Sequence, residues 1–80
     1  MESVLYHFKG CPFCGRVLAF IEEHGILLEK KDIHESDEIK QELISIGSKS
    51  QVPCLVIDGK PLYESADIIE WLQTNVLKSN

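Results

Sequence analysis

The sequence predicts an α/β domain in which three helices flank a four-stranded mixed sheet, in the order β-α-β-α-β-β-α. Two observations lead to this fold class. Short apolar runs of strand length alternate with segments whose apolar residues recur at helical spacing, and Asp58-Gly59 separates the last two runs as a hairpin turn. The first strand–helix–strand unit requires parallel strands with a right-handed crossover. Eighty residues are typical of one domain, so we expect a single domain over residues 1–80.

The first half of the chain predicts a strand, a helix and a second strand. Residues 4–8 are apolar and aromatic, as expected of a strand. A helix follows from Pro12, whose fixed φ suits the first helical position, to about residue 24. Gly25 can end this helix in the left-handed conformation. Residues 26–33 place apolar side chains around a charged middle, which predicts a second strand near the sheet edge.

The next segment predicts a helix followed by a central strand. Ser36 is expected to cap this helix, and Gly47 to stop it. Its apolar face would consist of Ile39, Leu43, Ile44 and Ile46. Residues 52–57 are apolar throughout, which is typical of a strand buried at the centre of a sheet.

The last segment predicts a hairpin and a third helix. Asp58-Gly59 favours a type I′ turn, and the proline at the start of residues 61–63 fits an edge strand. Glu64 or Ser65 would cap the last helix, and residues 78–80 would fray. The buried stripe of this helix would be Ile68, Ile69, Leu72 and Val76. Four strands and three helices in this order form a thioredoxin-like domain.

Cys11-Pro12-Phe13-Cys14 predicts a redox-active dithiol. Cys11 falls at the N-cap of the first helix, where free backbone N–H groups and the helix dipole stabilise a thiolate, the species that attacks disulfides. Cys14 lies one turn later and would act as the more covered, resolving thiol. The alternative is half of a metal site, but structural zinc usually takes a second pair of ligands, so we expect no metal. Cys54, within an apolar strand, is interpreted as a buried inert thiol, and His7, His24 and His34 as structural or solvated.

Composition restricts the partners and the compartment. The net charge of −5, spread along the chain, argues against nucleic acid, which requires a basic patch. No apolar run approaches the roughly 18 residues of a membrane span. Met1-Glu2-Ser3 lacks the basic start of a signal peptide, so we expect a cytoplasmic monomer whose cysteines are catalytic rather than structural.

The dithiol motif, Val52-Pro53 before a core strand, and the Asp58-Gly59 hairpin together resemble the glutaredoxin family over nearly the whole chain. The resemblance implies that Cys11 forms a mixed disulfide with glutathione, which is a co-substrate, and that Cys14 resolves mixed disulfides. It also implies a cis peptide bond before Pro53, which would expose the Val52 backbone to glutathione. The implied glutathione contacts are Lys9, Phe13, Gln51, Val52, Pro53, Glu64, Ser65 and Asp67.

One segment departs from the glutaredoxin pattern. Tyr63-Glu64-Ser65-Ala66-Asp67 stands where glutaredoxins have a Gly-Gly-x-Asp-Asp sequence, and it looks more like the N-terminal domain of glutathione transferases. In that family a Glu-Ser pair binds the γ-glutamyl group. A transferase, however, has a single catalytic residue where this chain has two thiols. Both resemblances imply glutathione as the ligand.

Three functions follow as hypotheses. The first is a glutathione-dependent thiol–disulfide oxidoreductase that reduces protein disulfides and protein–glutathione mixed disulfides through Cys11 and Cys14. The second is a thioredoxin-like electron donor reduced by a flavoenzyme. The third is an iron–sulfur or metal-binding carrier module.

Overall fold

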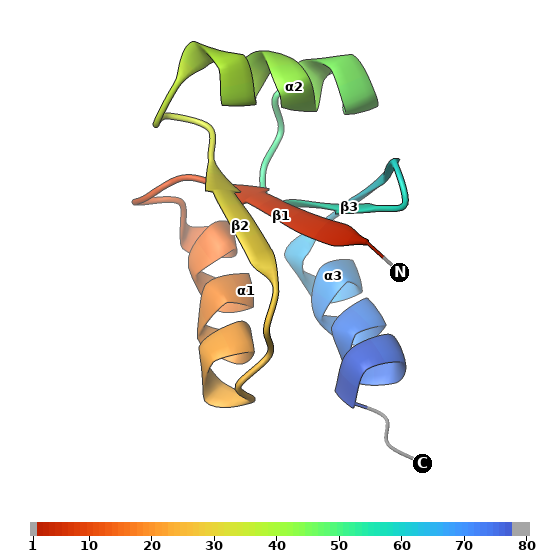
Figure 1. The fold of residues 1–80 in the computed structure, drawn as a ribbon. Helices are drawn as coiled ribbons and strands as arrows, with labels where there is room; N and C mark the ends of the chain where they lie inside the picture. The colour runs from red at the N-terminus through yellow and green to blue at the C-terminus, as the bar shows by residue number, and fades with distance from the viewer. Residues whose placement is uncertain (1, 78–80) are drawn as a thin grey trace.

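The computed structural model describes residues 2–77 and confirms the predicted order of elements (Figure 1). A π-helical turn, η1, extends the last helix, and the frayed end predicted at residues 78–80 lies outside the described residues. The elements are β1 (Ser3–His7), α1 (Pro12–Glu23), β2 (Glu29–Asp32), α2 (Asp37–Gly47), β3 (Cys54–Ile57), β4 (Lys60–Tyr63), α3 (Ser65–Leu72) and η1 (Gln73–Leu77).

The four strands form one mixed sheet in the order β2-β1-β3-β4. β1 and β2 are parallel, whereas β3 is antiparallel to both β1 and β4. The charged strand β2 and the proline-containing strand β4 therefore occupy the two edges, as predicted. α1 and α3 lie on one face of the sheet and α2 on the other (Figure 1).

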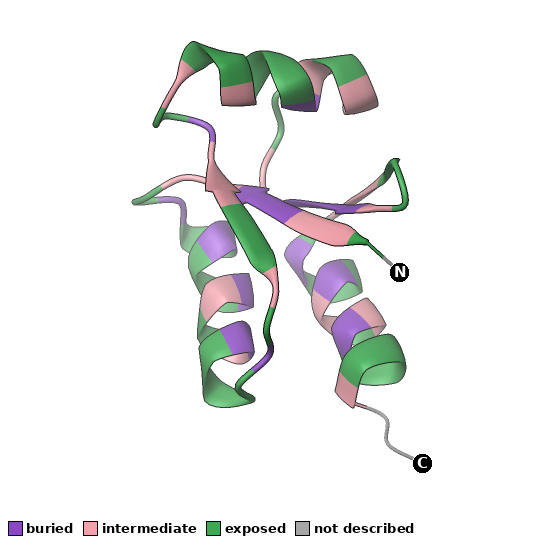
Figure 2. Ribbon diagram, in the orientation of Figure 1, coloured by how far each residue is buried: buried purple, intermediate pink, exposed green. Residues whose placement is uncertain are grey.

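The core is divided between the two faces of the sheet (Figure 2). Successive strand side chains point to opposite faces, so Leu5 packs toward α1 and α3 while Tyr6 packs toward α2. The cluster under α1 and α3 contains Leu5, Val17, Ile21, Ile26, Leu55, Ile68 and Leu72. The smaller cluster under α2 contains Tyr6, Ile33, Leu43, Cys54 and Val56.

Two strands are shorter in the structure than the sequence predicted. β2 begins at Glu29 rather than at residue 26, because the Ile26 N–H donates to the Ile21 carbonyl at the end of α1 instead of joining the sheet. β3 begins at Cys54 rather than at residue 52, because Pro53 has no N–H to donate to a strand ladder.

The turns and helix ends agree with the prediction at several positions. Ser36 caps α2, and its hydroxyl accepts the Ile39 N–H at 3.2 Å. Asp58 and Gly59 both have positive φ, 50° and 85°, as a type I′ turn requires, and Gly25 adopts the left-handed conformation after α1.

α2 ends at Gly47, as predicted, and Ser48 after it adopts the left-handed conformation with φ 66°. One prediction about the last helix is wrong, because Val76 does not belong to its buried stripe. Val76 is 46% exposed, because the chain changes to π-helical geometry after Leu72 and this rotates later side chains away from the buried stripe.

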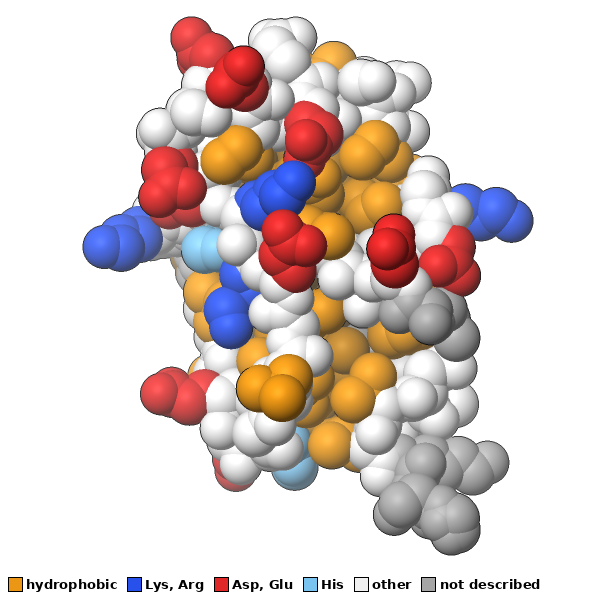
Figure 3. Space-filling model, viewed as in Figure 1, with side chains coloured by type: hydrophobic (Ala, Val, Ile, Leu, Met, Phe, Trp, Pro, Cys, Tyr) orange, Lys and Arg blue, Asp and Glu red, His pale blue; other side chains and the backbone are white. Residues whose placement is uncertain are grey.

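Figure 3 shows hydrophobic side chains at the surface on both sides of the sheet. Hydrophobic side chains reach the surface between α1 and α3, and most acidic side chains on this face lie around α2 and the sheet (Figure 3). Within residues 2–77, no helix combines the length and the apolar character needed to cross a membrane.

Candidate active site

Three segments of the chain meet at one end of the sheet. Tyr6 of β1 pairs with Cys54 of β3, and Cys54 pairs with Tyr63 of β4, so these residues form a row across three strands. β1 and β4 run toward this end, and β3 starts from it. The dithiol motif, the Val52-Pro53 segment and the start of α3 all lie just beyond that row. The topology therefore brings together three of the segments that the sequence singled out.

Cys11 is the N-cap of α1, as predicted. Its backbone is extended (φ −79°, ψ 115°), and its Sγ accepts the Cys14 N–H at 3.2 Å. No residue in the first turn of the described helix α1 is acidic. A donated N–H and the positive end of the helix dipole both favour negative charge on a sulfur atom. Cys11 retains 9% of its surface exposed, so this sulfur lies at the boundary between core and solvent.

Cys14 has the opposite environment although it lies in the same turn. Its side chain is completely buried, and burial together with the contact to Cys11 raises its pKa to about 12. At neutral pH Cys14 is therefore a protonated thiol. Both cysteines are free and buried, so one turn of helix holds a capping sulfur at the edge of the core and a completely buried thiol behind it.

The surface beside Cys11 is aromatic and basic. Phe13 is 57% exposed, and the Arg16 guanidinium lies 6.0 Å from the centre of its ring. Lys9 is exposed in the turn that leads to Cys11. Two basic residues thus lie within five positions of Cys11 in the sequence, although the chain as a whole carries a net charge of −5.

The loop after α2 provides the second segment. The Val52–Pro53 peptide bond is cis, as the resemblance implied, and Pro53 is buried while Gln51 is exposed. Cys54 follows with no exposed surface, and burial raises its pKa, which agrees with the interpretation of an inert thiol.

The start of α3 provides the third segment. Ser65 is the only buried polar residue among those described, at 7% exposure. Glu64 occupies the N-cap position with φ 75°, an unfavourable conformation for a side chain with a Cβ, and its carbonyl accepts the Ile68 N–H. The sequence does not reveal this strained backbone, because only glycine signals positive φ reliably. Strain of this kind is concentrated at functional sites.

Asp67 is an exposed residue in the first turn of α3, two positions after Ser65. It lines a separate cavity of about 370 Å³ together with residues of β4, α3 and η1. The other lining residues are Leu62, Glu70, Trp71, Thr74 and Asn75.

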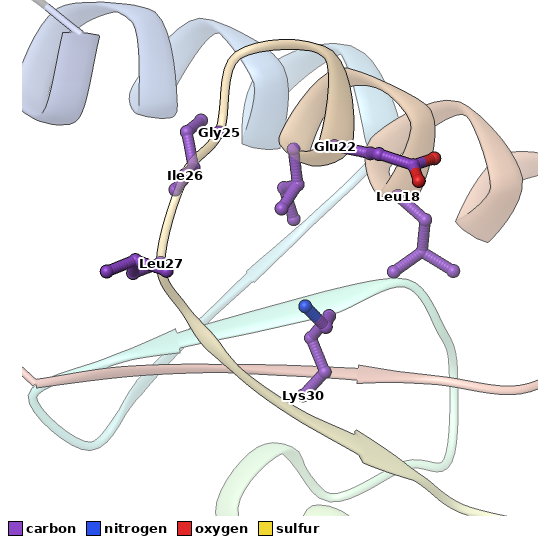
Figure 4. A pocket seen from close by; sticks show the side chains of 7 residues that line it. Leu18, Glu22, Gly25, Ile26, Leu27 and Lys30 are labelled. Atoms are coloured by element: carbon purple, nitrogen blue, oxygen red, sulfur yellow. The ribbon is translucent and has the colours of Figure 1, made fainter.

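A second cavity, of about 360 Å³, lies at the far end of α1 (Figure 4). Leu18 extends from α1 toward β2, and Lys30 extends from β2 toward α1 (Figure 4). Because this cavity involves the C-terminal half of α1, it is remote from Cys11 at the N-terminus. Its lining residues are Leu18, Ile21, Glu22, Gly25, Ile26, Leu27 and Lys30.

With this geometry in view, comparison with known proteins identifies the family. The family described as "Glutathione S-transferase, N-terminal domain" matches residues 5–77. The chain belongs to this family. The match agrees with the transferase-like Glu64-Ser65 segment, and it confirms the resemblance drawn from the sequence.

Individual relatives of this glutathione S-transferase N-terminal domain are more distant. Prostaglandin E synthase 2 of Danio rerio is 32% identical over 77 residues, which cover 95% of this chain and 20% of that protein. The chain thus spans about a fifth of the length of the curated relatives it matches. Glutathione transferase Omega 3C from Trametes versicolor has a TM-score of 0.80 and 27% identity, with 100% of this chain and 36% of that chain covered.

A glutaredoxin from Archaeoglobus fulgidus has the same fold. Its TM-score is 0.71 at 24% identity, with 90% of this chain and 86% of that chain covered. This likeness confirms the predicted thioredoxin-like fold.

Proposed function

We propose that this domain is a glutathione-dependent thiol–disulfide oxidoreductase. In the first step the Cys11 thiolate attacks a substrate disulfide, forms a mixed disulfide and releases one substrate thiolate. In the second step Cys14 attacks Cys11 Sγ, which closes the Cys11–Cys14 disulfide and releases the second thiol. Two glutathione molecules then reduce that disulfide and become glutathione disulfide. Two electrons pass from glutathione to the substrate, which is a disulfide-containing or glutathionylated protein.

One observation carries this proposal: the two sulfur atoms in the first turn of α1 have opposite environments. Cys11 Sγ accepts a backbone N–H at a helix N-terminus, whereas burial raises the pKa of Cys14 to about 12. A nucleophile must be charged to attack, and a resolving thiol must remain protonated until the mixed disulfide has formed. The pair is arranged for these two successive roles.

Glutathione as the reductant is supported by the two other segments at this end of the sheet. The Val52 backbone before the cis bond can pair with an extended peptide, and the N–H groups at the start of α3 can receive a carboxylate. Family membership points to the same ligand. We place Lys9, Phe13, Gln51, Val52, Pro53, Glu64, Ser65 and Asp67 in the proposed contact set. A cytoplasmic site of action is part of the proposal, because glutathione keeps a disulfide-reducing dithiol in its reduced form there.

The family match favours a second candidate, transfer of glutathione to an electrophile. This reaction would use the same binding residues but would activate the glutathione thiol rather than attack a disulfide. It needs no second cysteine. Loss of Cys14 would therefore leave conjugation unchanged while preventing the reduction of protein disulfides.

The test compares three cysteine variants in two assays. One assay follows reduction of a glutathionylated small thiol by glutathione, coupled to glutathione reductase. The other follows reduction of a protein disulfide. We expect Cys11→Ser to abolish both activities, Cys14→Ser to retain the first and lose the second, and Cys54→Ala, as the matched control, to retain both. Full activity of Cys11→Ser would refute the proposal.

The choice of reductant is decided with the wild-type domain. Reduction of the Cys11–Cys14 disulfide is measured with glutathione and, separately, with a flavoprotein thioredoxin reductase and NADPH. Rapid reduction by the flavoenzyme and none by glutathione would favour the electron-donor hypothesis instead. Formation of a glutathione conjugate with an aromatic halide, retained by Cys14→Ser, would favour transfer.

A further inference from the structure

The described residues include one buried polar group that the fold leaves without a partner. Nδ1 of His7 is the only buried side-chain nitrogen or oxygen in residues 2–77 that makes no hydrogen bond. Buried polar atoms are almost always paired, because leaving one unpaired costs about 1–3 kcal/mol. His7 is the last residue of β1, four positions before Cys11. Its unpaired nitrogen therefore lies close in the chain to the dithiol.

The packing of β1 on α1 places His7 at the level of Cys14. Leu5 of β1 packs with Val17 and Ile21 of α1, and the next residue on the same face of the strand is His7. α1 runs back along β1, so the buried residue one turn before Val17 is Cys14. Two strand residues advance ~6.6 Å, and the three helical residues from Cys14 to Val17 rise ~4.5 Å, so the two steps are comparable.

A second observation supports this placement. The backbone N–H of Phe8, the residue after His7, interacts with the Cys14 sulfur and partly offsets the increase in the pKa of Cys14. Cys14 Sγ thus lies beside the His7–Phe8 peptide.

The charged groups around His7 lie on β2 and the following turn. Asp32 pairs with His7 in the sheet. The charges of Asp32 and Glu35 raise the pKa of the imidazole, and the charge of Lys30 lowers it. Burial is the largest effect and lowers the pKa of His7, so the ring is neutral at neutral pH and has a lone pair free to accept a proton. The charge of Asp32 also raises the pKa of Cys14, so the same carboxylate influences both His7 and Cys14.

We propose that Nδ1 of His7 accepts the Cys14 proton when Cys14 attacks the Cys11 mixed disulfide. This inference rests on the proposed function. The Cys14 S–H bond breaks and its proton moves to Nδ1, while the sulfur forms a bond to Cys11 Sγ. The bond from Cys11 Sγ to the substrate sulfur breaks, and the departing thiolate takes a proton from the imidazolium or from water. Cys11 and Cys14 are oxidised to the disulfide, and the substrate is reduced to its thiol.

The test measures only the resolving step, in which Cys14 attacks the mixed disulfide on Cys11. A mixed disulfide is formed on Cys11 with a chromophoric aromatic thiol, and release of that thiol is followed in a stopped-flow instrument between pH 5 and 9. We expect His7→Phe to slow release roughly 100-fold at pH 7, the usual contribution of a positioned base. His24→Gln, at the far end of α1, is the matched control and should behave as wild type.

The pH profile separates proton transfer from structural damage. In the wild type, the rate of thiol release should level off above the pKa of His7. In His7→Phe, this rate should rise about tenfold per pH unit, because it follows the thiolate fraction of Cys14. If His7→Phe fails to fold, His7→Gln has the same predicted profile and retains a polar side chain. A His7 variant that folds and levels off as the wild type does would overturn the inference.

A double variant separates failure of this inference from failure of the proposed function. Adding His7→Phe to Cys14→Ser should leave the monothiol reaction with glutathione unchanged, because no Cys14 proton is involved. An equal loss in both backgrounds would refute a role at Cys14. Absence of the monothiol reaction in Cys14→Ser itself would instead refute the proposed function.

Discussion

Replacing Gly47 with alanine tests whether the contact between α2 and β4 is as close as the structure indicates. A methyl group at this position would overlap the Tyr63 hydroxyl oxygen and lie 3.2 Å from its ring carbon Cζ. The same hydroxyl donates a hydrogen bond to the Gly47 carbonyl at 3.3 Å, and the Lys49 ammonium lies 4.3 Å from the ring centre. The ring must therefore move to admit the methyl group, and both interactions would be disturbed.

The expected cost exceeds the expected gain. Over-packing typically costs about 1–3 kcal/mol, and losing a neutral hydrogen bond costs about 0.5–1.5 kcal/mol. Exchanging glycine for alanine inside a helix gains up to about 1 kcal/mol, but Gly47 is the last residue of α2 and gains less. The net destabilisation should be about 1–2 kcal/mol. For a domain of this size each kcal/mol lowers the Tm by about 4–8 °C.

Urea denaturation followed by circular dichroism measures the change, and Tyr63→Phe provides the matched background. Without the hydroxyl, only the 3.2 Å approach to Cζ remains, so Gly47→Ala should cost less than half as much in Tyr63→Phe as in the wild type. A Gly47→Ala variant as stable as the wild type would show that helix propensity outweighs this contact. Equal costs in both backgrounds would show that the hydroxyl is not the obstacle.

Two further predictions concern α2. Ser36→Ala removes the hydroxyl that caps the helix and should lower the free energy of unfolding by about 1 kcal/mol in urea denaturation, whereas Ser36→Asp, which can still cap, should lose little. The hydrogen bond from Lys31 and then that from Tyr6 lower the pKa of Glu42, so its contribution to stability is present above the ordinary carboxyl pKa and is lost as pH falls through the lowered value. Glu42→Gln should therefore make the free energy of unfolding less dependent on pH below about pH 5, measured by urea denaturation at several pH values, and an unchanged slope would contradict the role of this cluster.

The local part of the fold could be predicted because its causes lie within a few residues. Pro12 marks the start of α1 and thereby places Cys11 at the N-cap, and Asp58-Gly59 determines a turn that only positive φ allows. The burial of Cys14 follows from the same helical spacing as that of Val17. For Cys11 and Cys14, sequence reasoning therefore predicted the N-cap position of one and the burial of the other correctly.

The remaining features depend on contacts between distant segments. Gly47 reads as a helix stop, but its small size is required by Tyr63, which lies sixteen positions later in the chain. The positive φ of Glu64 has no signature in the residue type, because it arises where β4 gives way to α3. The unpaired Nδ1 of His7 is equally hidden, since a histidine in a strand is normally paired or solvated. Each feature becomes visible only when the packed neighbours are known.

The dithiol and the two proposed binding segments are positioned by different strands of the same sheet. β1 positions the dithiol through α1, whereas β3 and β4 position the cis-proline segment and the start of α3. Under the proposed function the latter two segments hold glutathione, so the residues at the start of α1 can change without rebuilding the ligand site. In this chain that position holds two cysteines of opposite environment, with His7 on the adjoining strand. The proposed chemistry therefore depends on one strand–helix unit, whereas the proposed ligand site depends on the segments at the two ends of the β3–β4 hairpin.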